Sequence, residues 1–134
     1  MTRHRLLFAA AIVWVLAARP ACPQDRKPGD MYLELVSATK KATAFEQIAP
    51  YLSRAFLKDM KAQPKAQRDE WFKYFKDTLN LTDIKFTKEA VSGDKCVLEA
   101  TAKNAAGKTS TGKVELVREK GAWKFSDHGW ATEH

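Results

Sequence analysis

The sequence has few of the residues that metalloproteins and disulfide-rich proteins concentrate. Its 134 residues include two cysteines, Cys22 and Cys96, and three histidines. A disulfide framework is excluded unless Cys22 is retained after export. No His, Cys or carboxylate residues cluster at the spacing of metal ligands. We therefore expect neither a metal site nor a bound cofactor.

A glycine-rich phosphate loop is also missing. The run Gly107-Lys108-Thr109 matches the end of such a loop, but the glycine required earlier falls on Ala102. The run also joins two expected strands, whereas a phosphate loop joins a strand to a helix. We reject a nucleotide-binding loop at this position.

The sequence has no hydrophobic run that is long enough to span a membrane as a helix. The unbroken apolar run Leu6 to Ala18 has 13 residues, whereas a spanning helix needs roughly 20. It follows a basic start and is typical of a secretory signal peptide, which we place at residues 1–22. We expect a periplasmic or secreted protein. Lipidation at Cys22 is an alternative, because Ala21 suits a lipoprotein box whereas Arg19 does not.

The positive charge excess is modest once the signal segment is set aside. The whole chain has a formal charge of +7, but residues 23–134 hold 20 basic and 16 acidic residues, and the two signs are interspersed. This pattern is typical of solvated helix faces rather than of a phosphate-binding stripe. We expect no nucleic-acid partner and no membrane contact beyond export or a lipid anchor.

Residues 23–29 are polar, contain two prolines and have the composition of a linker, so the folded domain spans residues 30–134. Asp30 is the expected N-cap of a first helix that ends near Ala42. Thr43 and Glu46 have the spacing of a capping box for a second helix. Pro50 should divide that helix into a short turn and a longer part.

A third helix is predicted from Pro64 to about Thr78, because proline suits a first helical turn. Its aromatic residues fall at helical spacing, which indicates a core face. They are Trp71, Phe72 and Phe75.

After Leu79 the hydrophobic period changes to alternation, which predicts four antiparallel strands joined by hairpins. The last hairpin turns at Lys120-Gly121. Three helices followed by such strands indicate an α+β domain with the helices on one face of the sheet. The expected inward residues of strands two to four are Cys96, Leu98, Ala100, Val114, Leu116, Trp123 and Phe125.

The closing stretch from Leu116 to Phe125, Leu-Val-Arg-Glu-Lys-Gly-Ala-Trp-Lys-Phe, resembles the nuclear transport factor 2-like superfamily of cone-shaped domains. The stretch Ser92 to Leu98 is similar to an earlier turn and strand of its small exported bacterial members. The resemblance covers roughly residues 30–130. It implies three helices packed on a curved antiparallel sheet of about four strands, with an apolar ligand pocket between the two layers. The implied pocket residues are Tyr32, Val36, Leu98, Leu116 and Trp123.

The superfamily includes isomerases, dehydratases and hydrolases, which place a Tyr on the first helix and an Asp or His on the sheet. Here Val36 occupies the corresponding part of the first helix, and no carboxylate stands at an inward strand position. This departure weakens an enzymatic interpretation.

The weak catalytic candidates are His128 and Tyr32. His128 lies neither in the signal segment nor at the C-terminus, and a histidine at a pocket mouth suits acid–base chemistry. The simpler interpretation, an exposed histidine at a strand end, is favoured, and Asp127 should point to the opposite face. Cys96 is expected to be an inert buried thiol.

Three functions remain open. The first is a non-enzymatic exported domain that binds a small apolar ligand or a partner protein. The second is a small isomerase or hydrolase that uses His128 with Tyr32. The third is a structural module that forms a homodimer through the outer face of its sheet.

Overall fold

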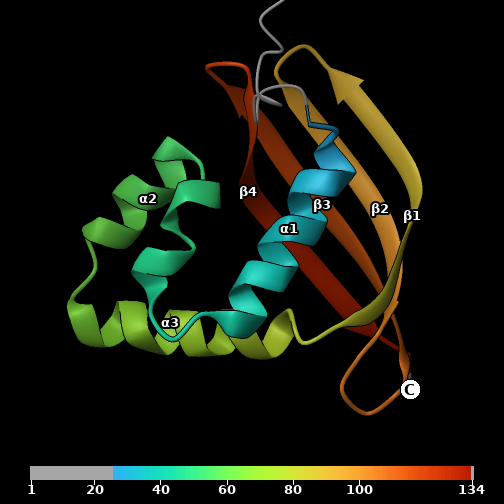
Figure 1. Ribbon diagram of the computed structural model, residues 1–134, viewed down its shortest axis with the longest axis horizontal. Helices are drawn as coiled ribbons and strands as arrows, with labels where there is room; N and C mark the ends of the chain where they lie inside the picture. Colours follow the sequence, from blue (N-terminus) through green and yellow to red (C-terminus); the bar gives the residue numbers. More distant parts are fainter. Residues whose placement is uncertain (1–25, 134) are drawn as a thin grey trace, which may run out of the picture.

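The computed structural model describes residues 26–133 and shows helices followed by a four-stranded sheet (Figure 1). The predicted signal segment and Cys22 lie outside the described residues. The order is α1 Pro28–Lys41, the 3-10 turns η2 Phe45–Gln47 and η3 Ala49–Tyr51, α2 Arg54–Lys61, α3 Lys65–Thr78, β1 Thr82–Ser92, β2 Lys95–Lys103, β3 Thr109–Glu119 and β4 Ala122–Thr132.

Helix α1 begins at Pro28, three residues before the start at Met31 that an N-cap at Asp30 implies. Lys27 is the N-cap residue, and Asp30 lies in the first turn instead of capping it. Proline is favoured at the first helical position because its missing amide hydrogen has no partner there in any case. The helix ends at Lys41, close to the predicted end.

The segment after α1 divides at Pro50 as predicted, with two 3-10 turns before α2. The predicted capping box of Thr43 and Glu46 is wrong. Gln47 Oε1 instead accepts hydrogen bonds from the backbone amides of Thr43, at 2.6 Å, and Ala44, at 3.3 Å. The capping side chain is Gln47 and not Glu46 because the first turn is a tight 3-10 turn that starts at Phe45.

The core of the helical layer is aromatic, as the spacing in α3 predicts. Phe72 and Phe75 are buried, and Trp71 stacks on Phe75 with 4.6 Å between ring centroids. Phe75 in turn packs edge-on against Phe125 of β4, with 5.4 Å between ring centroids. This contact joins α3 to the sheet.

The sheet is an antiparallel meander in the order β1-β2-β3-β4. It confirms the α+β prediction, but it is an open sheet rather than a closed or strongly curled one (Figure 1). The helices lie against one face. The other face exposes a mixture of charges, which are carried by Lys95, Lys103, Lys113, Glu115 and Asp127.

The inward residues of β2 and β3 are those predicted from the alternation. Leu98 pairs with Val114, and Cys96 pairs with Leu116, and all four side chains are buried. Paired residues in an antiparallel ladder point to the same face, so these residues form one continuous apolar surface under the helices.

One irregularity interrupts the pairing of β3 with β4. Leu116 pairs with Phe125, but Glu115 pairs with Asp127, so Ser126 is an extra residue on β4. Such a bulge reverses the face to which each later side chain points. Phe125 before the bulge and His128 after it therefore both face the helices.

The bulge also turns Trp130 inward, onto its β3 partner Gly112. A Cβ atom added to Gly112 would lie only 2.4 Å from the indole atom Cδ2 of Trp130. Glycine is therefore required here for the indole to lie against β3.

We predict that Gly112→Ala lowers the free energy of unfolding by about 1–3 kcal/mol, because the added methyl group displaces the indole. Urea unfolding monitored by circular dichroism measures the change. Gly129→Ala is the matched control, because Gly129 is the neighbouring strand glycine and a Cβ atom added there would meet nothing within 4 Å. Equal stability of the two variants would contradict the close packing of Trp130.

Candidate functional site

The structure brings together the two catalytic candidates, Tyr32 of α1 and His128 of β4. The Tyr32 hydroxyl lies 3.3 Å from His128 Nδ1, and Trp130 Nε1 donates a hydrogen bond to the same hydroxyl at 3.0 Å. We call Tyr32, His128 and Trp130 the polar cluster. Its three members come from opposite ends of the domain sequence, and the bulge at Ser126 aligns the two from β4.

The prediction that His128 is an exposed residue at a strand end is wrong. Its imidazole is partly buried and stacks on Phe75, with 5.2 Å between ring centroids. The physical reason is the bulge, which reverses the expected orientation of His128. Asp127 remains on the outer face, and its Oδ1 accepts a hydrogen bond from the backbone amide of His128, at 2.9 Å. The two side chains therefore do not pair.

Burial controls the protonation of the polar cluster. It lowers the pKa of His128 to about 4, although the Asp127 carboxylate acts in the opposite direction. It also raises the pKa of the Tyr32 phenol, an effect that the hydrogen bond from Trp130 partly offsets. At neutral pH the imidazole is neutral, and its tautomer determines whether Tyr32 Oη or His128 Nδ1 donates the proton of their hydrogen bond.

The Tyr32 hydroxyl is already engaged by its two neighbours in the polar cluster. It accepts a hydrogen bond from Trp130 Nε1 and shares a second one with His128 Nδ1. The tyrosine side chain is fully buried. The cluster is thus a satisfied buried network, which fixes α1 against β4.

The other predicted pocket residues lie in the packed core. Leu98 and Leu116 are fully buried, and Val36 is 4% exposed. Trp123 is 7% exposed and lines a small hollow of about 260 Å³ together with Met31. The Arg118 guanidinium lies 4.7 Å from the centre of the Trp123 ring.

Cys96 is buried, and burial is the main cause that raises the pKa of its thiol. A protonated buried thiol is a poor nucleophile. The structure therefore agrees with an inert cysteine.

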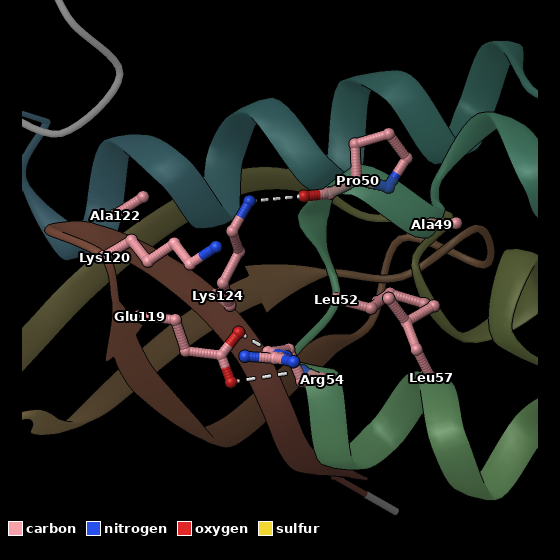
Figure 2. Close-up of a pocket in the computed structure, with 9 residues that line it drawn as sticks. All are labelled: Ala49, Pro50, Leu52, Arg54, Leu57, Glu119, Lys120, Ala122 and Lys124. Atoms are coloured by element: carbon pink, nitrogen blue, oxygen red, sulfur yellow. Dashed lines mark hydrogen bonds between the residues drawn. The ribbon is translucent and has the colours of Figure 1, made fainter.

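A larger hollow lies at one end of the sheet, between the segment Ala49–Leu57 and the hairpin of β3 and β4 (Figure 2). Its volume is about 780 Å³. We call it the end groove. Its lining residues are Ala49, Pro50, Leu52, Arg54, Leu57, Glu119, Lys120, Ala122 and Lys124.

Backbone contacts to β4 hold the two walls of the end groove together. Leu52 forms a bridge with Phe125, and the Ser53 amide donates to the Phe125 carbonyl at 2.8 Å. Ser53 then caps α2, its Oγ accepting from the Phe56 amide at 3.2 Å. These contacts fix the position of α2 relative to β4.

Two side-chain contacts cross the end groove (Figure 2). The Glu119 carboxylate accepts the Arg54 backbone amide at 3.1 Å, and Lys124 Nζ donates to the Pro50 carbonyl at 2.6 Å. The Pro50 carbonyl is available because the Ser53 and Arg54 amides, which would bond to it in a continuous helix, donate to Phe125 and Glu119 instead.

The end groove combines an apolar wall with a charged rim. Leu52 and Leu57 lie on the helical side, whereas Lys120 and Lys124 lie on the strand side (Figure 2). Sequence reasoning missed this site because its walls lie about 65 residues apart, as the contact of Arg54 with Glu119 shows. The available signals were Pro50 and the charges around the turn at Lys120.

Within residues 26–133, no group of three His, Cys, Asp or Glu side chains is placed to hold a metal ion. None of the helices described there is both long enough and apolar enough to cross a bilayer. No family model, curated protein or solved structure matches the chain.

The polar cluster predicts an unusual titration of His128. Because its folded-state pKa of about 4 lies below the ordinary value of 6.5, the unfolded chain binds a proton first on acidification. The stabilising contribution is full above pH 6.5 and is lost as the pH falls to 4. We expect an NMR titration midpoint near pH 4 for the His128 imidazole.

The lowered pKa of His128 should reduce the free energy of unfolding by about 3 kcal/mol as the pH falls from 6.5 to 4. His128→Gln keeps an acceptor for Tyr32 but has no titrating group, so its stability should fall less over this range. An NMR midpoint near 6.5 would contradict the burial of the imidazole.

Proposed function

We propose that the protein is a non-enzymatic domain that binds a small apolar ligand in the end groove. The observation that supports this most is the groove's volume of about 780 Å³ beside Leu52 and Leu57. Small-molecule sites typically have volumes of ~300–1,000 Å³ and apolar walls with a few polar groups. The walls are also fixed in advance by the contacts to Phe125.

We further propose that the chain is an exported, nuclear transport factor 2-like domain with an open sheet. Three helices before a four-stranded meander support this finer assignment. The space between the layers is occupied by Tyr32, Leu98 and Leu116, which are fully buried. A ligand would therefore bind at the end of the sheet rather than between the layers.

The binding proposal predicts that Leu57→Asn weakens capture of an uncharged apolar probe. The polar amide removes apolar contact from the wall of the end groove, so we expect a roughly tenfold weaker Kd. The measurement is fluorescence titration with N-phenyl-1-naphthylamine, which brightens in apolar surroundings.

The matched control is Leu33→Asn, because Leu33 is 39% exposed on α1 and does not line the end groove. This variant should bind the probe as the native protein does. Absence of probe binding to the native protein, or equal losses in both variants, would contradict the proposed site.

A second candidate function, a small hydrolase or isomerase, is favoured by the contact of Tyr32 with His128. A neutral imidazole can accept a proton as a general base once a substrate reaches it, although its lowered pKa makes it a weak one. Release of nitrophenol from p-nitrophenyl acetate provides a direct assay.

The binding proposal predicts that His128→Gln leaves the rate of this release unchanged at the background value. A native rate well above background that is lost in both His128→Gln and Tyr32→Phe would favour the enzyme instead. Circular dichroism of both variants shows whether the fold is retained.

A further inference from the structure

We propose that the ligand of the end groove is an amphiphilic carboxylate, an alkyl chain with an acidic headgroup such as a medium-chain fatty acid. This inference rests on the proposed function and adds the chemistry of the headgroup. The alkyl chain lies on the apolar wall, and the carboxylate lies at the rim among Arg54, Lys120 and Lys124.

The charge of the rim is the first argument. Three cationic side chains line the end groove, against the single carboxylate of Glu119. That carboxylate already accepts the backbone amide of Arg54 through both of its oxygens, at 3.2 and 3.1 Å. The groove therefore has a net positive charge that an anionic headgroup complements.

The second argument is that these cations are available. In the part of the chain that the structure describes, no ion pair is found for Arg54, Lys120 or Lys124. Arg54 and Lys120 are exposed, and Lys124 uses one of its three protons on the Pro50 carbonyl. An arginine next to lysines presents several donors to a carboxylate, and charge-assisted hydrogen bonds are the stronger kind.

The third argument is that the basic rim continues along α2. A neighbouring hollow of about 540 Å³ shares Arg54 and Leu57 with the end groove. Its remaining lining residues are Ala55, Lys58 and Lys61. Apolar and cationic side chains are thus adjacent over both hollows, which is the pattern that an amphiphile with one acidic end requires.

The test compares three single-chain probes of similar length whose headgroups are anionic, neutral and cationic: octanoate, octan-1-ol and octyltrimethylammonium. Isothermal titration calorimetry of the protein at pH 7.5 and low salt measures each Kd. We expect octanoate to bind roughly tenfold more tightly than octan-1-ol, as one charge-assisted contact provides. The cationic probe should bind most weakly, and the preference for octanoate should shrink at high salt.

The double variant Arg54→Gln with Lys120→Gln removes two exposed cations but keeps the apolar wall. It should lose the preference for octanoate, measured as the ratio of its Kd values for octan-1-ol and octanoate. Lys73→Gln, a change of an exposed lysine on α3 outside the groove, is the matched control and should keep the preference.

The outcomes separate the two levels of the proposal. Binding of all three probes with equal affinity, or an unchanged preference in the double variant, would contradict the proposed acidic headgroup. Either result would still agree with an apolar ligand in the end groove. Failure of every probe to bind would overturn the proposed function itself.

Discussion

Phe125 is the residue on which the arrangement of helices and sheet depends. The centroid of its ring lies 5.7 Å from that of Phe56 in α2 and 5.4 Å from that of Phe75 in α3. Its carbonyl accepts a hydrogen bond from the Ser53 amide. Aromatic pairs of this kind add to the gain from burying apolar area. Phe125 thus fixes α2 and α3 to β4. The end groove lies next to this contact, between the segment Ala49–Leu57 and the hairpin of β3 and β4.

The bulge at Ser126 gives β4 a second function in the packing. Without the extra residue, Asp127 would face the core, and burying an unpaired carboxylate is costly. With it, His128 and Trp130 turn inward and complete the hydrogen bonds of Tyr32. The polar cluster is therefore better explained as a device that secures α1 to the sheet than as a catalytic centre. Gly112 makes room for it by leaving space for the indole.

The sequence predicted well what depends on local pattern. Alternation placed Leu98, Val114 and Leu116 on the inward face, and Pro50 marked the division of the second helix. It failed for His128, because a single bulge residue is specified by tertiary packing and leaves no local signal. It also missed the end groove, whose walls meet only when Ser53 bonds Phe125 across the fold. The open form of the sheet likewise depends on contacts between strands.

We propose that ligands bind in the end groove and leave the polar cluster undisturbed. The most direct measurement is to map the backbone amide NMR shifts of the protein during titration with octanoate. We expect shifts concentrated at residues 52–57 and 119–124, with little change at Tyr32 and Trp130. Shifts centred on Tyr32, His128 and Trp130 would contradict it and place the site between the layers.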